Sequence, residues 1–383
     1  MPDDEEDVMK RIFQGKISIS LPEKPLTDFK PWHRPRKHYL RLKQWCHEAA
    51  KLIDSLGLKD GDELRYLGLP GEDLLDLWVL RGVCERAKVR LRYLGFDSSR
   101  RSASINLATH KVNSNDFIHP SSLILGDSLQ SLLKEGSLGL SRADANAPYD
   151  IINLDLCDSV VDQAVPESYP NLEVVRALCD LQRQRRGRPW LLFLTTRVLK
   201  DGISEDALKR MFSCIIENIK SAADFPETLE KQLGISPGTI ENATSVEEFD
   251  DEKWMGCHTL AFAKWLLIYL VKMQCSVRLL DSYVYNVVKT RKDMVSLGFL
   301  IEPVRLAGSD PSGMTVGLLP GTVQAIDEAA LACAMVSQVS RMSDLDGMME
   351  MEPEIFASFI EKKAKLLETV GYDPDAFRAW AAN

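Results

Sequence analysis

Four aspartates stand where they could meet one ligand together. Asp97, Asp127 and Asp155 each come at the end of a short apolar run that is typical of a buried strand, and Asp158 follows closely. If these strands are parallel, their carboxyl ends share one edge of the sheet and the carboxylates converge on one crevice. Carboxylates can accept hydrogen bonds from the hydroxyls of a nucleoside-type ligand. Each aspartate could instead cap a turn or a helix start.

The elements that would position these aspartates alternate between strand and helix. The first unit, residues 63–97, contains a strand over 64–69, a tight turn at Pro70-Gly71, an apolar helix and a strand over 89–96. Further strands are predicted over 122–127, 151–156 and 190–195, with a helix start over 128–134 and a helix over 171–186. This alternation predicts a largely parallel sheet with right-handed crossovers.

The rest of the chain predicts a different arrangement. Residues 98–120 are polar and irregular, with one weak helix at most. Residues 202–232 and 254–273 are helical, with a polar insertion between them, and strands over 276–285 and 294–303 are joined closely enough to pair antiparallel. Helices are predicted over 323–339, 353–370 and 374–382, after a Gly/Pro-rich linker over 308–321.

We therefore predict an α/β fold with a doubly wound, mostly parallel sheet, a reversed last strand, and helical additions at the N-terminal and C-terminal ends. Residues 1–57 would form an acidic, mobile tail and a helical segment. Residues 58–305 would form the sheet domain, with a helical insertion near 201–255, and residues 306–383 a linker and a C-terminal helical region.

This order of elements resembles the class I S-adenosylmethionine-dependent methyltransferase fold, with its reversed last strand. The resemblance implies S-adenosylmethionine as cofactor. It places Asp97 at the ribose hydroxyls and Asp127 near the adenine amine. Asp155 and Asp158 would lie beside the transferred methyl group as candidate catalytic residues. The expected cofactor contacts are Gly68, Pro70, Gly71, Asp97, Asp127 and Ser128.

Two motifs of that family are absent from the sequence. The first turn, Leu67-Gly68-Leu69-Pro70-Gly71-Glu72, contains no GxGxG, and Pro70 removes one amide donor. After the fourth strand the chain reads Asp155-Leu156-Cys157-Asp158, without the Pro-Pro-aromatic motif of amino-methyltransferases that act on bases. Cys157 stands where a cytosine-C5 nucleophile would, although a buried structural thiol is the favoured interpretation.

A basic and aromatic segment, residues 29–45, precedes the sheet domain and continues from Arg36 as a helix to residue 56. Its cations include Arg34, Arg36, Lys37, Arg41 and Lys43, and it contains no acidic residue. Such a segment can neutralise phosphates and stack on bases. It could equally be a helix face that packs its aromatics on the main domain and pairs its charges with acidic residues.

Two hypotheses follow from these features. The first is an active methyltransferase whose substrate is a nucleic acid or a nucleotide. The second is a methyltransferase-like subunit without catalysis, which binds nucleic acid through residues 29–45 or a protein partner through the C-terminal helices, for example in a bacterial genome-defence or modification system. The three strand-end carboxylates favour the first hypothesis, and the missing motifs favour the second.

A second basic patch, formed by Arg183, Arg185, Arg186 and Arg188, comes just before the fifth strand. It should lie at the amino end of that strand, away from the crevice. Cations at the end of a helix complement its dipole, so we interpret the patch as an exposed helix terminus.

Composition narrows the class of protein further. The net charge of -9 argues against attraction of nucleic acid by the whole molecule. The eight cysteines form no CxxC and are expected to be reduced and buried, in a cytoplasmic protein. The histidines show no metal-ligand spacing, so no metal is expected. The acidic N-terminus is unlike a signal peptide, and the apolar run 259–273 is short for a membrane span, so no membrane is expected as a partner.

Overall fold

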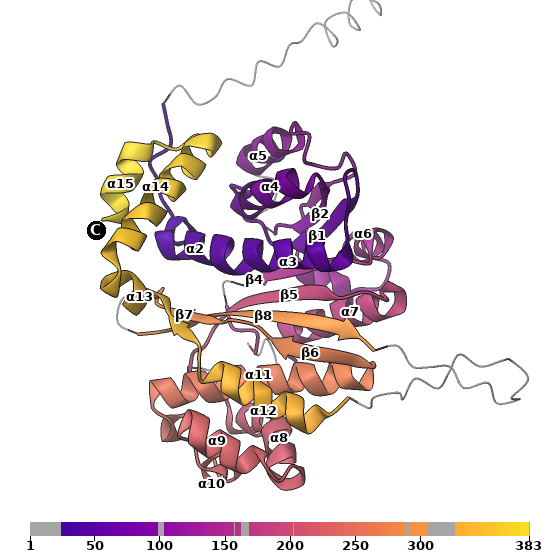
Figure 1. The fold of residues 1–383 in the computed structure, drawn as a ribbon, viewed down its shortest axis with the longest axis vertical. Coiled ribbons are helices and arrows are strands. Elements are labelled where there is room, and N and C mark those ends of the chain that lie inside the picture. Colours follow the sequence, from indigo (N-terminus) through magenta and orange to yellow (C-terminus); the bar gives the residue numbers. More distant parts are fainter. Residues whose placement is uncertain are drawn as a thin grey trace, which may run out of the picture.

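A mixed β-sheet runs through the centre of the protein in the computed structural model (Figure 1). The structure describes residues 24–98, 103–156, 158–161, 168–201, 203–287, 291–304 and 326–382. The expected mobile N-terminal tail, the linker over 308–321 and Cys157 lie outside these residues. The strand order is β3-β2-β1-β4-β5-β8-β7-β9, and β6 also pairs with β8.

Five parallel strands form the first part of the sheet. They are β1 (Glu63–Gly68), β2 (Arg90–Phe96), β3 (Leu123–Leu125), β4 (Ile151–Asp155) and β5 (Trp190–Arg197). β4 and β5 are buried along nearly their whole length, as expected for strands covered on both faces. The α/β fold with a mostly parallel sheet is confirmed.

The reversed strand is β8 (Met294–Pro303), which pairs antiparallel with β5. On its other edge β8 pairs antiparallel with β6 (Cys275–Leu279) and then with β7 (Tyr283–Tyr285). The predicted strand over 276–285 is therefore two strands, and their antiparallel pairing with β8 is confirmed. A short β9 (Ser343–Asp344) extends the edge beside β7.

Helices cover both faces of the sheet (Figure 1). α3 (His47–Leu56), α4 (Leu75–Ala87) and α5 (Ala103–Asn113) share one hydrophobic core with β1 and β2. The other face carries η3 (Leu129–Leu133), α6 (Leu138–Asn146), α7 (Pro170–Arg185), α8 (Glu205–Ser221) and α11 (Asp251–Lys272). Residues 98–120 were expected to hold one weak helix at most, whereas α5 runs over 11 residues. Its Ile105 and Val112 are buried one heptad apart, so packing on the sheet stabilises a helix that propensity alone does not predict.

The helix α11 lies in the core, between the sheet and a group of shorter helices. Those helices are α9 (Phe225–Leu233), α10 (Pro237–Glu241), η4 (Val246–Glu248) and α12 (Glu328–Val339). Among the described residues α11 is the one helix long and apolar enough to cross a membrane, and 78% of its most apolar window is buried inside the protein. Its packing is that of a core helix, as the sequence predicted.

The two ends of the described chain meet on one side of the molecule. The N-terminal segment contains η1 (Pro31–His33), α2 (Pro35–Leu40) and the π-helical turn η2 (Arg41–Cys46), which leads into α3. The C-terminal helices are α13 (Leu345–Met351), α14 (Pro353–Val370) and α15 (Pro374–Ala381). Leu26 N donates to Gly371 O at 3.0 Å, and Asp373 N donates to Leu26 O at 2.9 Å. Phe29 packs on Tyr372, Phe377 and Trp380 with ring centroids 5.4–5.6 Å away.

Candidate ligand-binding site

Two adjoining cavities open at the carboxyl ends of β1, β2 and β4, where the sheet topology predicts a ligand. The first, which we name the Gln130 cavity, has a volume of about 500 Å³. The second, the Tyr285 cavity, has a volume of about 380 Å³. Both are lined by the same five residues, Leu69, Gly71, Asp97, Asp155 and Leu156. The strand ends therefore bring Gly71, Asp97 and Asp155 together, and Asp158 joins them in the Gln130 cavity.

The Gln130 cavity has a polar wall on the side of α7. Gln130 Nε2 donates to Asn171 Oδ1 at 3.0 Å, and Asn171 Nδ2 donates to Ser159 O at 3.0 Å. The two amides are thereby oriented, while Phe96 adds an aromatic surface at the end of β2. The sequence did not single out Gln130 or Asn171. Polar residues are common in the first turn of a helix, so neither residue indicated a binding site by itself.

The Tyr285 cavity lies between the N-terminal segment and the ends of β1, β4, β5 and β7. Its walls are contributed by residues far apart in the sequence, among them Trp32, Leu75, Tyr285, Val287 and Met294. Tyr285 and Met294 are each 4% exposed, and Leu75 is 1% exposed, whereas Trp32 reaches the surface. The cavity is therefore an apolar space closed on one side by η1 and α2.

Lys37 from α2 joins the strand-end carboxylate of β4. Lys37 Nζ lies 2.6 Å from Asp155 Oδ1 and 3.4 Å from Thr195 Oγ1, and it faces the ring of Trp45 at 4.9 Å. Burial disfavours the charge on Lys37, but Asp155 and Tyr285 together outweigh it and raise the pKa of Lys37. Lys37 is thus a buried ammonium that neutralises Asp155.

A second buried ion pair lies beside the first. Arg41 Nε donates to Asp76 Oδ1 at 2.7 Å, and Arg41 Nη1 donates to Trp32 O at 3.0 Å. Arg41 and Asp76 are 3% and 2% exposed. Burial raises the pKa of Asp76, and the Arg41 guanidinium opposes that shift. This pair fixes the first turn of α4 to the N-terminal helix.

The loop between β1 and α4 is also held by a histidine. His33 Nε2 lies 2.8 Å from Asp73 Oδ2, and the Tyr372 hydroxyl donates to Asp73 Oδ1 at 3.2 Å. Burial acts to raise the pKa of Asp73, but the bond from His33 holds that pKa below its ordinary value. Asp73 therefore ties the loop to both the N-terminal segment and the C-terminal helices.

The cations expected to bind nucleic acid divide into two groups. Lys37 and Arg41 are buried in the ion pairs described above, so their charges meet carboxylates of the chain instead of solvent. Arg36 pairs with Asp346 at 2.6 Å, and the Arg34 guanidinium stacks on Trp380 at 4.0 Å. Lys43 is exposed. A nucleic-acid contact stays a prediction for Arg34, Arg36 and Lys43, and a protein contact stays a prediction for the C-terminal helices.

Four residues expected to contact a cofactor have local roles in the structure. A Cβ on Gly68 would lie 2.8 Å from Asn153 O, so Gly68 allows β1 and β4 to approach closely, and it lines neither cavity. Pro70 lines the Tyr285 cavity and packs over Gly95. Asp127 Oδ1 accepts from Ser128 N at 2.8 Å, and Ser128 Oγ accepts from Gln130 N at 3.3 Å. Asp127 and Ser128 line neither cavity and shape the start of η3, and a cofactor contact stays a prediction for both.

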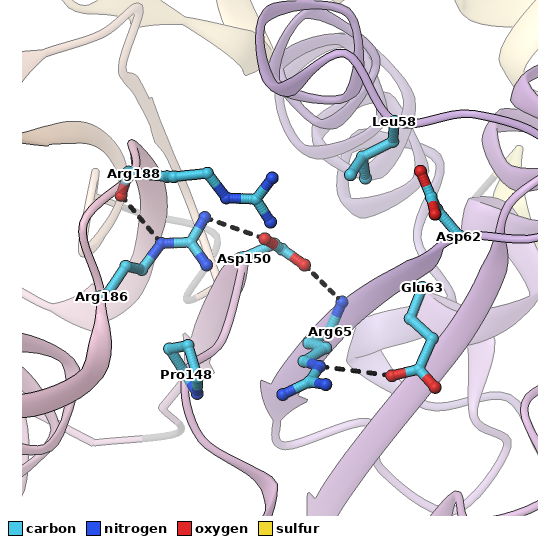
Figure 2. Close-up of a pocket in the computed structure, with 8 residues that line it drawn as sticks. All are labelled: Leu58, Asp62, Glu63, Arg65, Pro148, Asp150, Arg186 and Arg188. Carbon is cyan, nitrogen blue, oxygen red and sulfur yellow. Dashed lines mark hydrogen bonds and ion pairs between the residues drawn. The ribbon is translucent and has the colours of Figure 1, made fainter.

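The second basic patch lies at the opposite edge of the sheet, as its position before β5 predicted. Figure 2 shows Asp150 between Arg186 and Arg65, and these residues line, together with Arg188, a pocket of about 390 Å³. Arg186 Nη2 lies 2.8 Å from Asp150 Oδ1, and Asp150 Oδ2 accepts from Arg65 N at 2.7 Å (Figure 2). This buried pair joins the amino ends of β1, β4 and β5.

Most of the described cysteines lie inside the protein. Seven cysteines within the described residues are free, and five of them are buried. Burial raises the pKa of Cys84 and of Cys257 to about 12, so these thiols are inert. Within the described ranges, no three His, Cys, Asp or Glu side chains gather as a metal site.

Comparison with protein families matches residues 26–382 to the PP_RS20740-like family. The chain belongs to this family. No curated protein matches the PP_RS20740-like chain. Among solved structures it is similar to the S-adenosylhomocysteine-bound methyltransferase PaMTH1 of Podospora anserina, with 10% identity over 78% of this chain and 96% of that one and a TM-score of 0.29.

Proposed function

We propose that this protein binds S-adenosylmethionine in the crevice and transfers its methyl group to an acceptor. One observation carries the proposal: two cavities meet at Asp97 and Asp155, at the carboxyl ends of β2 and β4, in a sheet whose β8 strand is reversed. Strand order and reversed strand are those of the class I methyltransferase fold. In such sheets ligands bind outside the carboxyl ends of the strands.

The residues present fit the cofactor. Asp97 can accept both ribose hydroxyls, and Gln130 and Asn171 offer amide donors and acceptors to a base in the same cavity. Gly71 has φ +66° and open space where a side chain would stand, so the backbone can approach a ligand closely. Each cavity has the volume of a small-molecule site. When bound, S-adenosylmethionine supplies an electrophilic methyl group.

Pro70 has no backbone N–H that could donate to a cofactor, but this counts less against the proposal than the sequence alone suggested. The amide before it is already used, because Leu69 N donates to Asn153 O at 3.3 Å. The cofactor loop of this chain is stabilised by side chains, through the bonds that Asp73 makes with His33 and Tyr372. The loop therefore does not depend on a glycine-rich backbone for its shape.

A second candidate is a methyltransferase-like subunit that binds the cofactor or a partner without catalysis. The observation that favours it is the Lys37–Asp155 ion pair, which occupies the carboxylate of the fourth strand. Methyl transfer to the correct acceptor separates the two candidates, and cofactor binding alone does not.

Calorimetric titration with S-adenosylhomocysteine and S-adenosylmethionine tests the proposal. A ligand that binds only the native state stabilises it by about 2.7 kcal/mol at a hundredfold excess over Kd, so thermal unfolding should shift in parallel. Asp97→Ala should abolish binding. Asp127→Ala is the matched comparison, since Asp127 also follows a strand but lines neither cavity, and intact binding would exclude the cofactor contact predicted for it. Absence of heat and of a thermal shift at millimolar ligand would reject the cofactor.

A further inference from the structure

Part of the lining of the Tyr285 cavity is apolar. It is formed by Trp32 of η1, Leu75 of α4, Tyr285 of β7, Met294 of β8 and Val287 after β7. The Tyr285 ring is fully enclosed, and burial raises the pKa of its hydroxyl, which therefore stays protonated. This part of the cavity can surround a planar apolar group.

The cations that line this cavity are already neutralised within the chain. They form the pairs Arg36–Asp346 at 2.6 Å, Lys37–Asp155 at 2.6 Å, Arg41–Asp76 at 2.7 Å and Arg197–Asp293 at 3.6 Å. A phosphate bound at Arg41 would have to compete with Asp76, which is 2% exposed, and separating a pair that is buried in this way is costly. The buried part of the cavity, around Lys37 and Arg41, therefore disfavours anionic acceptors.

The Tyr285 cavity also has a carboxylate that it shares with the Gln130 cavity. It is the Asp155 carboxylate, whose Oδ1 is 2.6 Å from Lys37 Nζ and whose side chain is still 18% exposed toward the cavities. A carboxylate has several acceptor sites, so Asp155 can accept a further hydrogen bond while Lys37 holds it in place. Lys37 here is a positioning residue.

We propose, resting on the function proposed above, that the acceptor is a small uncharged molecule with a planar apolar body and one hydroxyl group, which donates to Asp155. If S-adenosylmethionine is bound, the acceptor oxygen would gain its methyl carbon, and the electron pair of the broken carbon–sulfur bond would stay on the sulfur of the cofactor. The displaced hydroxyl proton would pass by way of Asp155 to solvent, so that the Lys37–Asp155 pair keeps both of its charges.

Saturation-transfer NMR with 2-naphthol as the probe tests this assignment on the full chain, at saturating S-adenosylhomocysteine. 2-Naphthyl phosphate is the charged counterpart of the same shape, and a single-stranded oligonucleotide represents the nucleic-acid alternative. We expect 2-naphthol to bind at least about tenfold more tightly than its phosphate, a difference of about 1.4 kcal/mol.

Val287→Trp should fill the apolar part of the cavity. It should weaken 2-naphthol binding by about tenfold while the calorimetric Kd of S-adenosylhomocysteine stays within about twofold. Met351→Trp is the control, because Met351 is 77% exposed and lines neither cavity, and it should change neither affinity.

The outcomes separate the two proposals. If S-adenosylhomocysteine binds but the phosphate or the oligonucleotide binds more tightly than 2-naphthol, the acceptor class is wrong and the cofactor proposal stands. If Val287→Trp leaves 2-naphthol binding unchanged, the molecule binds elsewhere and the assignment is wrong. If S-adenosylhomocysteine does not bind, the function proposed above fails and this acceptor site fails with it.

Discussion

Lys37 Nζ lies 2.6 Å from Asp155 Oδ1, although 118 residues separate the two in the sequence. This contact anchors the N-terminal helix to the end of β4, inside the candidate site. Lys37→Met would leave the Asp155 carboxylate, which is 18% exposed, without its partner, and we expect a loss of about 1–3 kcal/mol in the free energy of unfolding. Urea denaturation measures it.

Lys43→Met provides the matched control for that prediction. It removes an exposed lysine from the same helical segment, so the free energy of unfolding should change by no more than about 0.5 kcal/mol. Equal effects of the two variants would show that the Lys37–Asp155 pair is not the anchor described here.

Two glycines beside the site should respond differently to alanine. A Cβ on Gly68 would lie 2.7 Å from the Tyr66 hydroxyl and 2.8 Å from Asn153 O, so Gly68→Ala must separate β1 from β4. A Cβ on Gly71 meets open space, and the cost of its φ of +66° is about 1 kcal/mol. Gly68→Ala should therefore lower the melting temperature more than Gly71→Ala. The reverse order would contradict the close packing of β1 on β4.

His258 should make the protein sensitive to acid. Both ring nitrogens are buried in α11 without a hydrogen-bond partner, and burial lowers the pKa of His258 from 6.5 to about 4. As pH falls from 6.5 towards 4, His258 binds a proton in the unfolded chain but stays neutral in the folded chain. The free energy of unfolding therefore decreases over this pH range. The difference of 2.5 pKa units corresponds to about 3 kcal/mol.

His258→Phe should remove that part of the pH dependence between pH 7 and pH 4, measured by urea unfolding at several pH values. His47→Phe, at a side chain that is 58% exposed, should leave it in place. An unchanged acid dependence in His258→Phe would place the sensitive group elsewhere.

Lys363 should destabilise the protein at neutral pH. Its Nζ is buried in α14 without a hydrogen-bond partner, near Arg41, Asp73 and Asp76, and burial lowers its pKa well below 10.5. Between the folded and the unfolded pKa, only the unfolded chain carries the proton, so stability rises as pH increases toward 10.5.

Lys363→Met removes this buried amine while keeping its volume. We expect a gain of about 1–3 kcal/mol at pH 7, the usual cost of an unsatisfied buried polar group, and a smaller gain at pH 10. Thermal unfolding at the two pH values measures it. A loss of stability at pH 7 would show that the amine is bonded in the folded protein.

The sequence predicts the sheet well because the signal is local. β1, β2, β4 and β5 are short apolar runs that end in turn residues, so each was found within two residues of its bounds. The gathering of Gly71, Asp97 and Asp155 also followed from topology, because parallel strands share one edge. Helix α5 was underestimated because its stability comes from packing of Ile105 and Val112 on the sheet.

The other wall of the site could not be predicted from local pattern. Trp32 and Lys37 enter the site because α2 docks against the ends of the strands, and Tyr285 enters because the strand over 276–285 breaks into β6 and β7. Both events depend on contacts between distant segments. The same docking explains why a run of cations without any acidic neighbour is mostly neutralised: its carboxylates come from α4, β4 and α13.

The backbone bonds of Leu26 to Gly371 and Asp373 bear on how the protein is made. They join the beginning of the described chain to the turn between α14 and α15, so the N-terminal segment has these partners only after residue 373 has been synthesised. Contacts of such long sequence separation form late, because a large loop must be closed first. We therefore expect the sheet to fold earlier, and the cavity that Trp32 and Lys37 line to be completed at the end of folding.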